Sequence, residues 1–577
     1  MLTASGAGIG TDTLKDVENV IGSNYSDTFI GDSEKANEFT GGTNTTGNGD
    51  TVDYSSLTDI NNDRIVADLS DGGDVFVVKG GVTKPTDKLY GIENITGTAG
   101  ADTITGNSGV NIINGGAGND TVKYSYLAGS NSVTVDLANG NATVTGGVID
   151  TLTNIENIIA SANDDTILMA TGNTTNIIDG GAHTTGDTIS YAAYSSGITI
   201  NLGVSTTQTV VASSNDIDTI TNIENLTGGS GNDALTGSTG NNTIDGGSGN
   251  DTLYSSAGDD KLIGGSQTTK DIANYINETN FIKVDMAQTA QVTKTGNAGK
   301  DTLTGIEEIW GSTYADSFVG DSAADTFRGA AGDDIMSGGA NTDTLYGDAG
   351  DDTLTGGAGN DTLSGGATGA DTLVGGDGND IFNISAAVAS TDTIKITDFG
   401  NGVDSIKGAF TGAARLNVTI DDTSSTTLDL SKVFIADTAI ATVTGGASAD
   451  VIIAGKGADV LNGGAGDDTM TGGTGADAFT VNAGTDVITD WGVGTDTLVI
   501  GSGAIAVYNV LKAGGTADFS LTTTVTSNSG TLVVDASNSR ATTISGTSGF
   551  DSITGSNYAD TISTGSTTAD WISGGAG

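Results

Sequence analysis

Cysteine is absent from this 577-residue sequence, and proline occurs once, at Pro85. A chain without cysteine has no disulfide framework and no zinc–thiolate site. The single proline excludes a proline-rich linker and suits long ladders of paired strands, which proline would interrupt. The sequence therefore predicts extended β structure that is held together by something other than disulfides.

Aromatic residues make up only 5% of the chain, and hydrophobic residues 36%. These values argue against a thick globular core and favour a thin core of aliphatic columns. No run of about 18 apolar residues is present, so no transmembrane helix is expected. The first residues lack a basic region followed by an apolar stretch, so they do not form a Sec signal peptide.

Basic residues are few, 20 against 72 acidic residues, which gives a formal net charge of −52. Such a surface repels nucleic acid and anionic membranes. Acidic chains of low hydrophobicity are often disordered. Here the acids are mostly periodic aspartates, which predicts a metal-dependent fold, disordered without its cations and ordered with them.

Histidine also occurs once, at His183 in the stretch GGAHTTGDT. One histidine cannot supply the H-E-x-x-H motif of a zinc protease, and neither a nucleophile elbow nor a P-loop signature is present. Pairs of carboxylates, which could serve a glycosidase, carry no information among 72 acids. We therefore expect His183 to be a surface residue of a variable turn, and we expect no enzyme within this chain.

What the chain does contain is a nine-residue repeat, most regular in GGAGNDTLS at residues 356–364. It has the form G-G-x-G-x-D-x-U-x, in which U is apolar. The steps between aspartates are nine residues with a single step of ten, at Asp316, Asp325, Asp334, Asp343, Asp352, Asp361, Asp371 and Asp380. A large apolar residue follows each aspartate by two positions: Phe318, Phe327, Met336, Leu345, Leu354, Leu363, Leu373 and Phe382.

The repeat has a direct physical interpretation. Glycines form a tight turn, and the last three residues form a short strand whose middle side chain points to one face. Stacked units bury a column of these side chains and also stack the carboxylates roughly 5 Å apart. Such a ladder repels itself unless cations lie between its rungs, and oxygen ligands suit calcium. A run of metal-free aspartate turns is the alternative.

At these residues the chain resembles the RTX (repeats-in-toxin), or hemolysin-type, calcium-binding proteins. The resemblance implies a parallel β-roll with two nonapeptides per turn and calcium between successive turns. It also implies export through a type I secretion channel. We therefore predict an all-β fold, a parallel β-roll or β-solenoid of calcium-binding nonapeptides with strand excursions and capping strands.

The phased aspartates are the predicted calcium ligands, together with carbonyl oxygens of the turns. Turns that carry asparagine at this phase, such as those of Asn37, Asn111 and Asn176, are expected to bind calcium weakly or not at all. The predicted metal ligands are Asp102, Asp120, Asp233, Asp251, Asp260, Asp316, Asp325, Asp334, Asp343, Asp352, Asp361, Asp371, Asp380, Asp450, Asp459, Asp468, Asp477, Asp551 and Asp560.

A longer repeat fills the first half of the chain. Its modules end in D-x-U-x-x-I-E-N, with glutamates at Glu18, Glu93, Glu156, Glu224 and Glu307. These glutamates either cap a turn, which we favour, or bind a further cation. After the nonapeptides, segments led by Tyr54, Tyr124, Tyr191 and Tyr275 run into alternating strands, which we expect to project from the stack as loops or hairpins.

The three tryptophans, Trp310, Trp491 and Trp571, could stack on sugars, but they occupy positions tolerant of size. Ordinary packing is the favoured interpretation for all three.

The remaining segments complete a division into six parts. Residues 392–406 and 486–498 are expected to cap the rolls, because a bare solenoid end exposes strand edges. The chain begins and ends within repeats, which suggests a fragment of a larger protein; an intact chain with ragged ends is the alternative. The predicted parts are the long modules (1–315), the main roll (316–383), a capping or irregular segment (384–444), a second roll (445–483), a second capping or irregular segment (484–541) and a truncated third roll (542–577).

These inferences predict an extracellular calcium-binding protein, secreted or on the cell surface, that folds on binding several calcium ions. Its role would be structural or adhesive, as in a surface layer or an RTX adhesin. The expected partners are a cell surface, a polysaccharide or further copies of the chain. The alternative is the accessory region of a secreted RTX protease, lipase or epimerase, whose catalytic domain would lie outside this chain, or part of a toxin.

Overall fold

The protein was examined as a computed structural model, in which every described element is a strand. In the described part of the chain, no helix is long and apolar enough to span a membrane. The structure describes the whole chain except residues 1, 7–8, 15–16, 33–34, 44–48, 58–62, 173–174, 212–215, 267–268, 290, 297–298, 385–392, 400–403, 409–414, 421–425, 432–438, 491–495, 501–503, 510–530, 536–542, 546–551, 555–560, 564–570 and 575–577.

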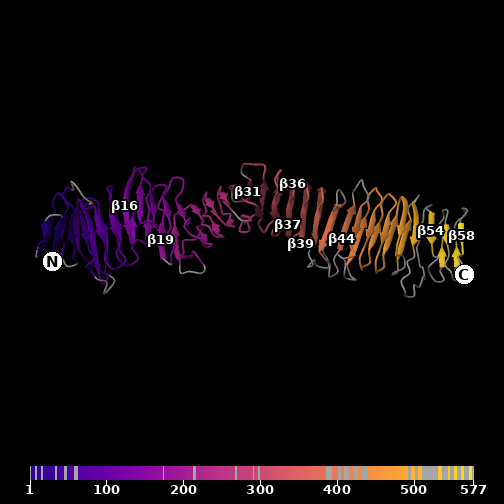
Figure 1. Cartoon of the computed structure of the whole chain (residues 1–577), viewed down its shortest axis with the longest axis horizontal. Helices are drawn as coiled ribbons and strands as arrows, with labels where there is room; N and C mark the ends of the chain where they lie inside the picture. The colour runs from indigo at the N-terminus through magenta and orange to yellow at the C-terminus, as the bar shows by residue number, and fades with distance from the viewer. Residues whose placement is uncertain are drawn as a thin grey trace. The chain divides into compact units, whose positions relative to one another are not determined.

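Each nonapeptide of the main repeat forms one strand, as the sequence predicts. Strand β36 (Ile335–Ala340) pairs in parallel with β38 (Thr353–Ala358), and β37 (Thr344–Ala349) pairs with β39 (Thr362–Thr368). Partners are 18 residues apart, so one turn of the chain contributes a strand to each of two walls. This is a parallel β-roll with two units per turn, and Figure 1 shows its strands stacked side by side.

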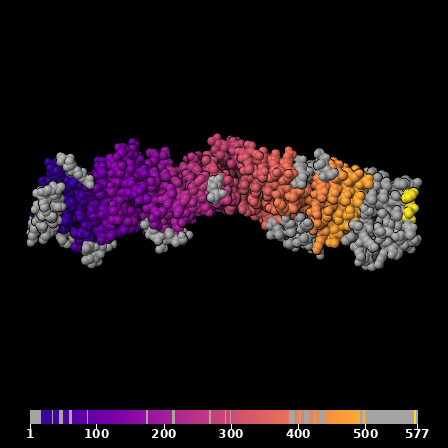
Figure 2. Space-filling view, viewed as in Figure 1, coloured from indigo at the N-terminus to yellow at the C-terminus, as the bar shows by residue number. Residues whose placement is uncertain are grey.

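The core is a double column of the apolar residues that follow the aspartates. On one wall Met336 stacks on Leu354, and on the other Leu345 stacks on Leu363; each is at most 1% exposed. The strand residues on either side of each column point outward. The thin aliphatic core that the composition predicts is therefore confirmed, and Figure 2 shows a closed surface over this stretch on the face in view.

Glycine is required at two positions of the repeat for different structural reasons. Gly357 has a φ of +117°, a left-handed conformation that side chains rarely adopt. Gly347 has no such angle, but a Cβ there would lie 2.2 Å from Asp352 Oδ2 and 2.5 Å from the carbonyl oxygen of Gly365. The first is needed for the turn, and the second lets two successive turns approach each other.

The described residues divide into two compact units. One comprises residues 1–274 and 297–306, and the other residues 275–296 and 307–577.

The first unit has two long walls. In order of pairing, the first wall contains β2 (Ile9–Leu14), β1 (Leu2–Gly6), β4 (Asp27–Ile30), β6 (Thr51–Asp53), β10 (Asn94–Thr96), β12 (Ile112–Asn114), β16 (Val148–Thr153), β15 (Asn141–Val144), β14 (Val133–Asp136), β18 (Thr166–Leu168), β20 (Thr188–Ser190), β24 (Asn225–Thr227), β26 (Thr243–Asp245), β28 (Lys261–Ile263) and β32 (Gly299–Thr304).

The second wall contains β3 (Asn19–Ile21), β5 (Glu38–Thr40), β9 (Val82–Tyr90), β8 (Gly73–Lys79), β7 (Arg64–Asp68), β11 (Thr103–Thr105), β13 (Thr121–Lys123), β17 (Asn157–Ile159), β19 (Thr175–Asp179), β23 (Ile217–Thr221) and β22 (Gln208–Thr209). A further set pairs in the order β21 (Thr199–Asn201), β25 (Ala234–Thr236), β27 (Thr252–Tyr254) and β29 (Ile272–Asn274).

The excursions led by Tyr54 and Tyr124 do not project from the stack, which corrects the expectation from sequence for these two. Strand β15 lies antiparallel between β14 and β16, while β16 pairs in parallel with β12 and β14 with β18. Strand β8 lies in the same way between β7 and β9. The alternating apolar residues of these strands are buried, so the excursion widens the wall by one antiparallel strand instead of leaving it.

The second unit also has two walls. The first contains β31 (Val292–Lys294), β30 (Ile282–Asp285), β34 (Ser317–Val319), β36, β38, β40 (Thr372–Asp377), β42 (Thr393–Phe399), β44 (Arg415–Ile420), β46 (Ile440–Thr444), β48 (Val460–Asn462), β50 (Ala478–Val481) and β52 (Thr497–Ile500).

The opposite side contains two runs of strands, and one further pair is joined to neither wall by a described pairing. The first run is β33 (Glu308–Trp310), β35 (Thr326–Arg328), β37, β39, β41 (Ile381–Ile384) and β43 (Ser405–Gly408). The second is β45 (Thr427–Asp429), β47 (Val451–Ile453), β49 (Thr469–Thr471), β51 (Gly484–Ile488), β53 (Ala504–Asn509), β54 (Thr531–Asp535), β56 (Ser552–Thr554) and β58 (Trp571–Ser573). The pair is β55 (Thr543–Ser545) and β57 (Thr561–Ser563).

The segments expected to cap the rolls contribute both internal and terminal strands. Strand β42 pairs in parallel with β40 and with β44, and β51 pairs with β49 and with β53, so these two strands continue their walls. Strands β43 and β52, which overlap the same segments, are the last of the described strands in their runs, and each pairs on one side, with β41 and β50 respectively.

Candidate calcium sites

The phased aspartates form ladders along the two edges of the main roll. The backbone N–H of Asp343 donates to Asp361 Oδ1 at 2.8 Å, and that of Asp334 donates to Asp352 Oδ1 at 2.9 Å. The acceptor is in each case the aspartate one full turn later. The same bond recurs at Asp102 to Asp120, Asp233 to Asp251, Asp316 to Asp334, Asp325 to Asp343, Asp352 to Asp371, Asp361 to Asp380, Asp450 to Asp468 and Asp459 to Asp477.

The second carboxylate oxygen, Oδ2, divides the predicted ligands into two groups. In the first group Oδ2 accepts the backbone N–H of the residue four positions earlier, as in an ordinary aspartate turn. Its members are Asp102, Asp233, Asp316, Asp325, Asp450 and Asp459. Here the turn itself supplies a donor to the carboxylate.

In the second group Oδ2 is buried and accepts no hydrogen bond from the described residues. Its members among the predicted ligands are Asp120, Asp251, Asp334, Asp343, Asp352, Asp361 and Asp468. These carboxylates are at most 1% exposed. A buried polar atom without a partner is costly, and a buried charge more so, unless another group satisfies it.

The electrostatics of the second group point the same way. Burial, followed by repulsion from Asp316 and Asp352, raises the pKa of Asp334 to about 8 despite the bond from the Asp316 N–H. Burial likewise raises the pKa of Asp352 to about 7 and that of Asp343 to about 6. Each ladder is therefore a row of carboxylates that are hard to ionise together unless a cation is present.

The oxygens around this row fit calcium. A Cβ placed on Gly347 would lie 2.2 Å from Asp352 Oδ2 and 2.5 Å from the Gly365 carbonyl oxygen. Oxygens of two successive turns therefore lie close together beside this glycine. The donor set is entirely carboxylate and carbonyl oxygen, which hard cations such as Ca²⁺ prefer. When bound, calcium would supply positive charge to the unpaired carboxylates, and the buried Oδ2 atoms together with turn carbonyls would hold it.

The other predicted ligands complete the picture. Asp260, Asp371, Asp380 and Asp477 are at most 2% exposed, and each accepts a backbone N–H from the preceding turn. Asp551 and Asp560 lie outside the described residues.

Asparagine at the ladder position behaves differently from aspartate. The Nδ2 of Asn242 donates to the carbonyl oxygen of Glu224 at 2.6 Å, and that of Asn111 donates to the Glu93 carbonyl at 3.0 Å. An amide thus fills with its own N–H the role that a cation would have beside a carboxylate. Weak or absent calcium binding at these asparagine positions stays a prediction.

Three of the recurring glutamates cap a turn, which confirms the favoured interpretation for them. Glu93, Glu156 and Glu224 each accept through Oε2 a backbone N–H, from Asp50, Asp120 and Asp187 respectively, at 2.7–2.9 Å. The glutamate therefore takes over the bond that Oδ1 of an aspartate makes elsewhere in the ladder.

Sequence reasoning missed a set of tyrosine–aspartate pairs. The hydroxyl of Tyr54 donates to Asp87 Oδ2 at 2.7 Å, and that of Tyr191 donates to Asp218 Oδ2 at 2.7 Å. Tyr124 contacts Asp150 in the same way at 3.2 Å. The signal was present, since the leading tyrosine and the module-ending aspartate recur together. At these rungs a hydroxyl satisfies the oxygen that is unpaired in the main roll.

These pairs should contribute a stability that does not depend on bound calcium. Replacing Tyr191 by phenylalanine leaves Asp218 Oδ2 buried without this donor, at a cost of about 1–3 kcal/mol. We expect a lower urea midpoint for unfolding of the first unit, by the same amount at every calcium concentration at which the unmodified chain is folded. Tyr25→Phe is the control, because Tyr25 is 52% exposed. A loss that disappears in high calcium would show that calcium binds at this rung instead.

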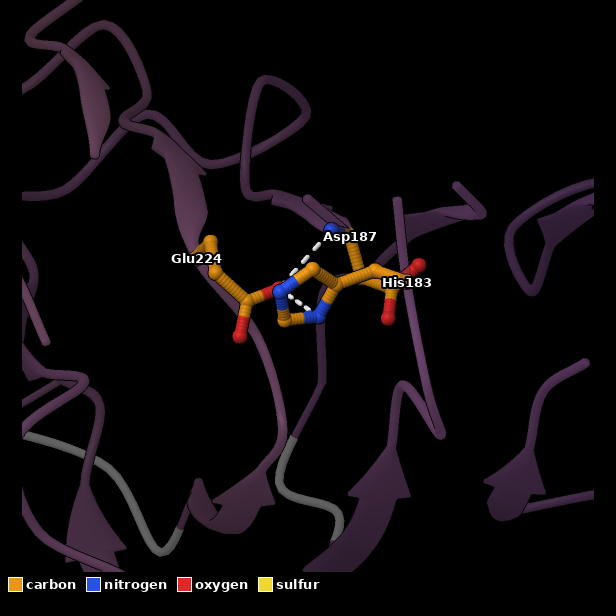
Figure 3. Close-up of side chains that lie close together, drawn as sticks. All are labelled: His183, Asp187 and Glu224. Atoms are coloured by element: carbon orange, nitrogen blue, oxygen red, sulfur yellow. Dashed lines mark hydrogen bonds and ion pairs between the residues drawn. The ribbon is translucent and has the colours of Figure 1, made fainter. Parts of the chain in front are cut away.

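The remaining residues singled out from sequence have local partners. Trp310 packs against the guanidinium of Arg328, 5.2 Å from its ring, so packing describes it better than a free sugar platform. Trp571 is 66% exposed, and Trp491 lies outside the described residues. His183 lies in a partly exposed turn, where its Nδ1 is 2.8 Å from Glu224 Oε2 (Figure 3).

Comparison with known proteins agrees with this geometry. The model of the RTX calcium-binding nonapeptide repeat matches residues 89–122, 226–266, 310–345, 337–368, 366–383, 444–479, 538–568 and 545–577. No curated protein matches the chain. The matched stretches contain every aspartate of the second group, and the modules around Asn37 and Asn176 lie outside them. The chain is thus a calcium-binding repeat protein that carries RTX nonapeptide repeats in multiple copies along a parallel β-roll.

Proposed function

We propose that this chain is an extracellular protein that folds when calcium fills its aspartate ladders. The observation that carries the proposal is the row of buried carboxylate oxygens without a hydrogen-bond donor at Asp334, Asp343, Asp352 and Asp361. We assign these four, with Asp120, Asp251 and Asp468, as the strongest ligands. The other predicted aspartates complete the set.

The coupling of calcium to folding follows from charge. A chain with a net charge of −52 resists compaction, and stacking its aspartates adds buried repulsion. Without calcium the unfolded chain keeps its carboxylates in water. At the millimolar calcium outside cells, sites with Kd of about 10⁻⁴–10⁻³ M fill and stabilise the stacked form.

The role that we propose is structural or adhesive, at a cell surface or in a secreted assembly. The support for this role is that the described residues consist of stacked repeats and wall strands. We keep the six-part division of the chain as part of this proposal, with the main roll at residues 316–383 as its most regular section.

A calcium titration followed by far-UV circular dichroism tests the proposal. We expect a cooperative change from coil to β structure near millimolar calcium, and little change at the same concentration of magnesium. Magnesium is the matched control because it has the same charge but dehydrates reluctantly and demands octahedral geometry. A β spectrum that is unaffected by calcium removal would contradict the proposal, since the aspartates would then only form turns.

A further inference from the structure

The turn that contains His183 differs from the ordinary nonapeptide turn. Residues 180–187 read GGAHTTGD, whereas the ordinary turn at residues 115–120 reads GGAGND. The turn is two residues longer, and the histidine stands where the shorter turn has Gly118. This histidine is the only one in the chain.

The longer turn is held in place by Asp164. Its carboxylate accepts the backbone N–H groups of Thr184, Thr185 and Gly186 at 2.7–3.1 Å and both threonine hydroxyls at 2.6–2.8 Å. These bonds, that of the Thr185 hydroxyl first, hold the pKa of Asp164 well below its usual range. The turn, and with it the backbone of His183, is therefore ordered by protein contacts alone.

Three potential metal ligands meet at this turn (Figure 3). A ring nitrogen of His183 and one carboxylate oxygen each of Asp187 and Glu224 all lie within 4.8 Å of one another. The Glu224 Oε2 atom lies 2.8 Å from His183 Nδ1 and also accepts the Asp187 N–H at 2.9 Å. Asp187 is fully buried, and its Oδ2 accepts no hydrogen bond from the described residues.

We propose that His183, Asp187 and Glu224 form a site for one divalent transition-metal ion such as Zn²⁺ or Ni²⁺. Imidazole nitrogen suits these ions, whereas calcium takes oxygen ligands. Two carboxylates balance the charge of the ion. In a tetrahedral site with bonds of 2.0–2.2 Å the ligand atoms lie about 3.4 Å apart. The His183 Nδ1 and Glu224 Oε2 atoms, now 2.8 Å apart, would separate slightly, and the carboxylate of Asp187, within 4.8 Å of both, would move to the same spacing.

The site can be reached from solvent. The side chain of His183 is 36% exposed, so a metal ion can enter beside the ring and keep a water molecule as a further ligand. Binding through Nδ1 requires the neutral ring to carry its proton on Nε2, which is the ordinary alternative tautomer. At the histidine, one proton moves from one ring nitrogen to the other, and any proton on the two carboxyl groups leaves to solvent as the metal binds.

The chain contains a matched pair of carboxylates without a histidine. Glu156 accepts the Asp120 N–H at 2.8 Å as Glu224 accepts that of Asp187, and Asp120 Oδ2 is likewise buried and unpaired within the described residues. That rung offers only oxygen. The two rungs should therefore differ in metal preference, and the histidine is the reason.

The test is a zinc titration of the full chain without a histidine tag, in millimolar calcium so that the oxygen sites are filled. Calorimetry should detect one zinc ion per chain, and the NMR signal of the single imidazole should shift with the same saturation curve. His183→Ala and Glu224→Gln should each weaken zinc binding by at least about tenfold, since even ligand-supporting contacts contribute 10–100-fold.

Glu156→Gln is the control, because it makes the same change at the rung without histidine and should leave zinc binding unaltered. Circular dichroism in calcium checks that each variant folds. If a variant fails to fold, the imidazole signal of the unmodified chain still shows whether zinc binds His183. A zinc titration that leaves this signal in place would overturn the proposal. So would a His183→Ala variant that binds zinc as tightly as the unmodified chain.

Discussion

Replacing Asp343, Asp352 and Asp361 together by asparagine is expected to lower the number of calcium ions bound and to destabilise the main roll in calcium. Each asparagine keeps an oxygen for the backbone N–H that donates to Oδ1, at 2.8 Å for Asp343 and 2.9 Å for Asp352. What changes is the buried, unpaired Oδ2, which becomes an amide nitrogen. The variant therefore removes the proposed calcium ligand and preserves the backbone ladder.

The expected loss of folding stability follows from the thermodynamic linkage between calcium binding and folding. With Kd of about 10⁻⁴–10⁻³ M, calcium at 10 mM stabilises each site by about 1.4–2.7 kcal/mol, and a lost site loses that amount. In metal-free buffer the sign should reverse, because the variant no longer buries three carboxylates that repel their neighbours. Calorimetry gives the stoichiometry, and hydrogen exchange of β36–β39 gives the local stability.

The control variant is Asp333→Asn, Asp351→Asn and Asp467→Asn, which makes the same change in charge at exposed turn positions. These side chains also accept a backbone N–H from the next turn, so the ladder of bonds is matched as well. Calcium stoichiometry that is equal in the unmodified chain and in the Asp343, Asp352 and Asp361 variant would refute the ligand assignment.

Lowering the pH is expected to stabilise the calcium-free fold in part, because protons neutralise the buried carboxylates that calcium would otherwise neutralise. In the folded chain burial raises the pKa of Asp334 to about 8 and the pKa values of Asp120, Asp251 and Asp352 to about 7, against an ordinary value near 3.8. The folded chain therefore holds protons more tightly than the unfolded chain. Its stability without metal rises as the pH falls below about 8, and the gain is complete only below the unfolded value.

The measurement is far-UV circular dichroism of calcium-stripped protein in metal-free buffer, from pH 8 down to pH 5. The β signal should grow over this range. In saturating calcium the same protons compete for the carboxylates, so acid should instead release calcium. The Asp343, Asp352 and Asp361 variant should respond less to acid than the Asp333, Asp351 and Asp467 control. A β signal that falls between pH 8 and pH 5 in metal-free buffer would contradict this account.

The nine-residue pattern was sufficient to predict the fold of the repeats. Aspartate and apolar residues in phase every nine positions specify a turn, a short strand and a buried column, because a strand alternates its side chains and 18 residues bring equivalent units into register. Met336 on Leu354 and Leu345 on Leu363 are the stacks that this phase predicts. The ladder of phased aspartates was likewise predicted from the sequence.

Which carboxylates lack a hydrogen-bond donor could not be predicted from the pattern, because it depends on contacts made in the folded chain. Asp334 and Asp316 occupy the same phase, but the Ser312 N–H donates to Asp316 Oδ2, and no described residue does so for Asp334. Distant partners also settled the role of β15 within a wall, the pairing of Tyr191 with Asp218, and the meeting of His183 with Glu224. The physical reason is that the repeat specifies a turn but not whether the N–H four residues earlier reaches Oδ2, as it does at Asp316. The other partners come from further turns of the roll, tens of residues away in sequence.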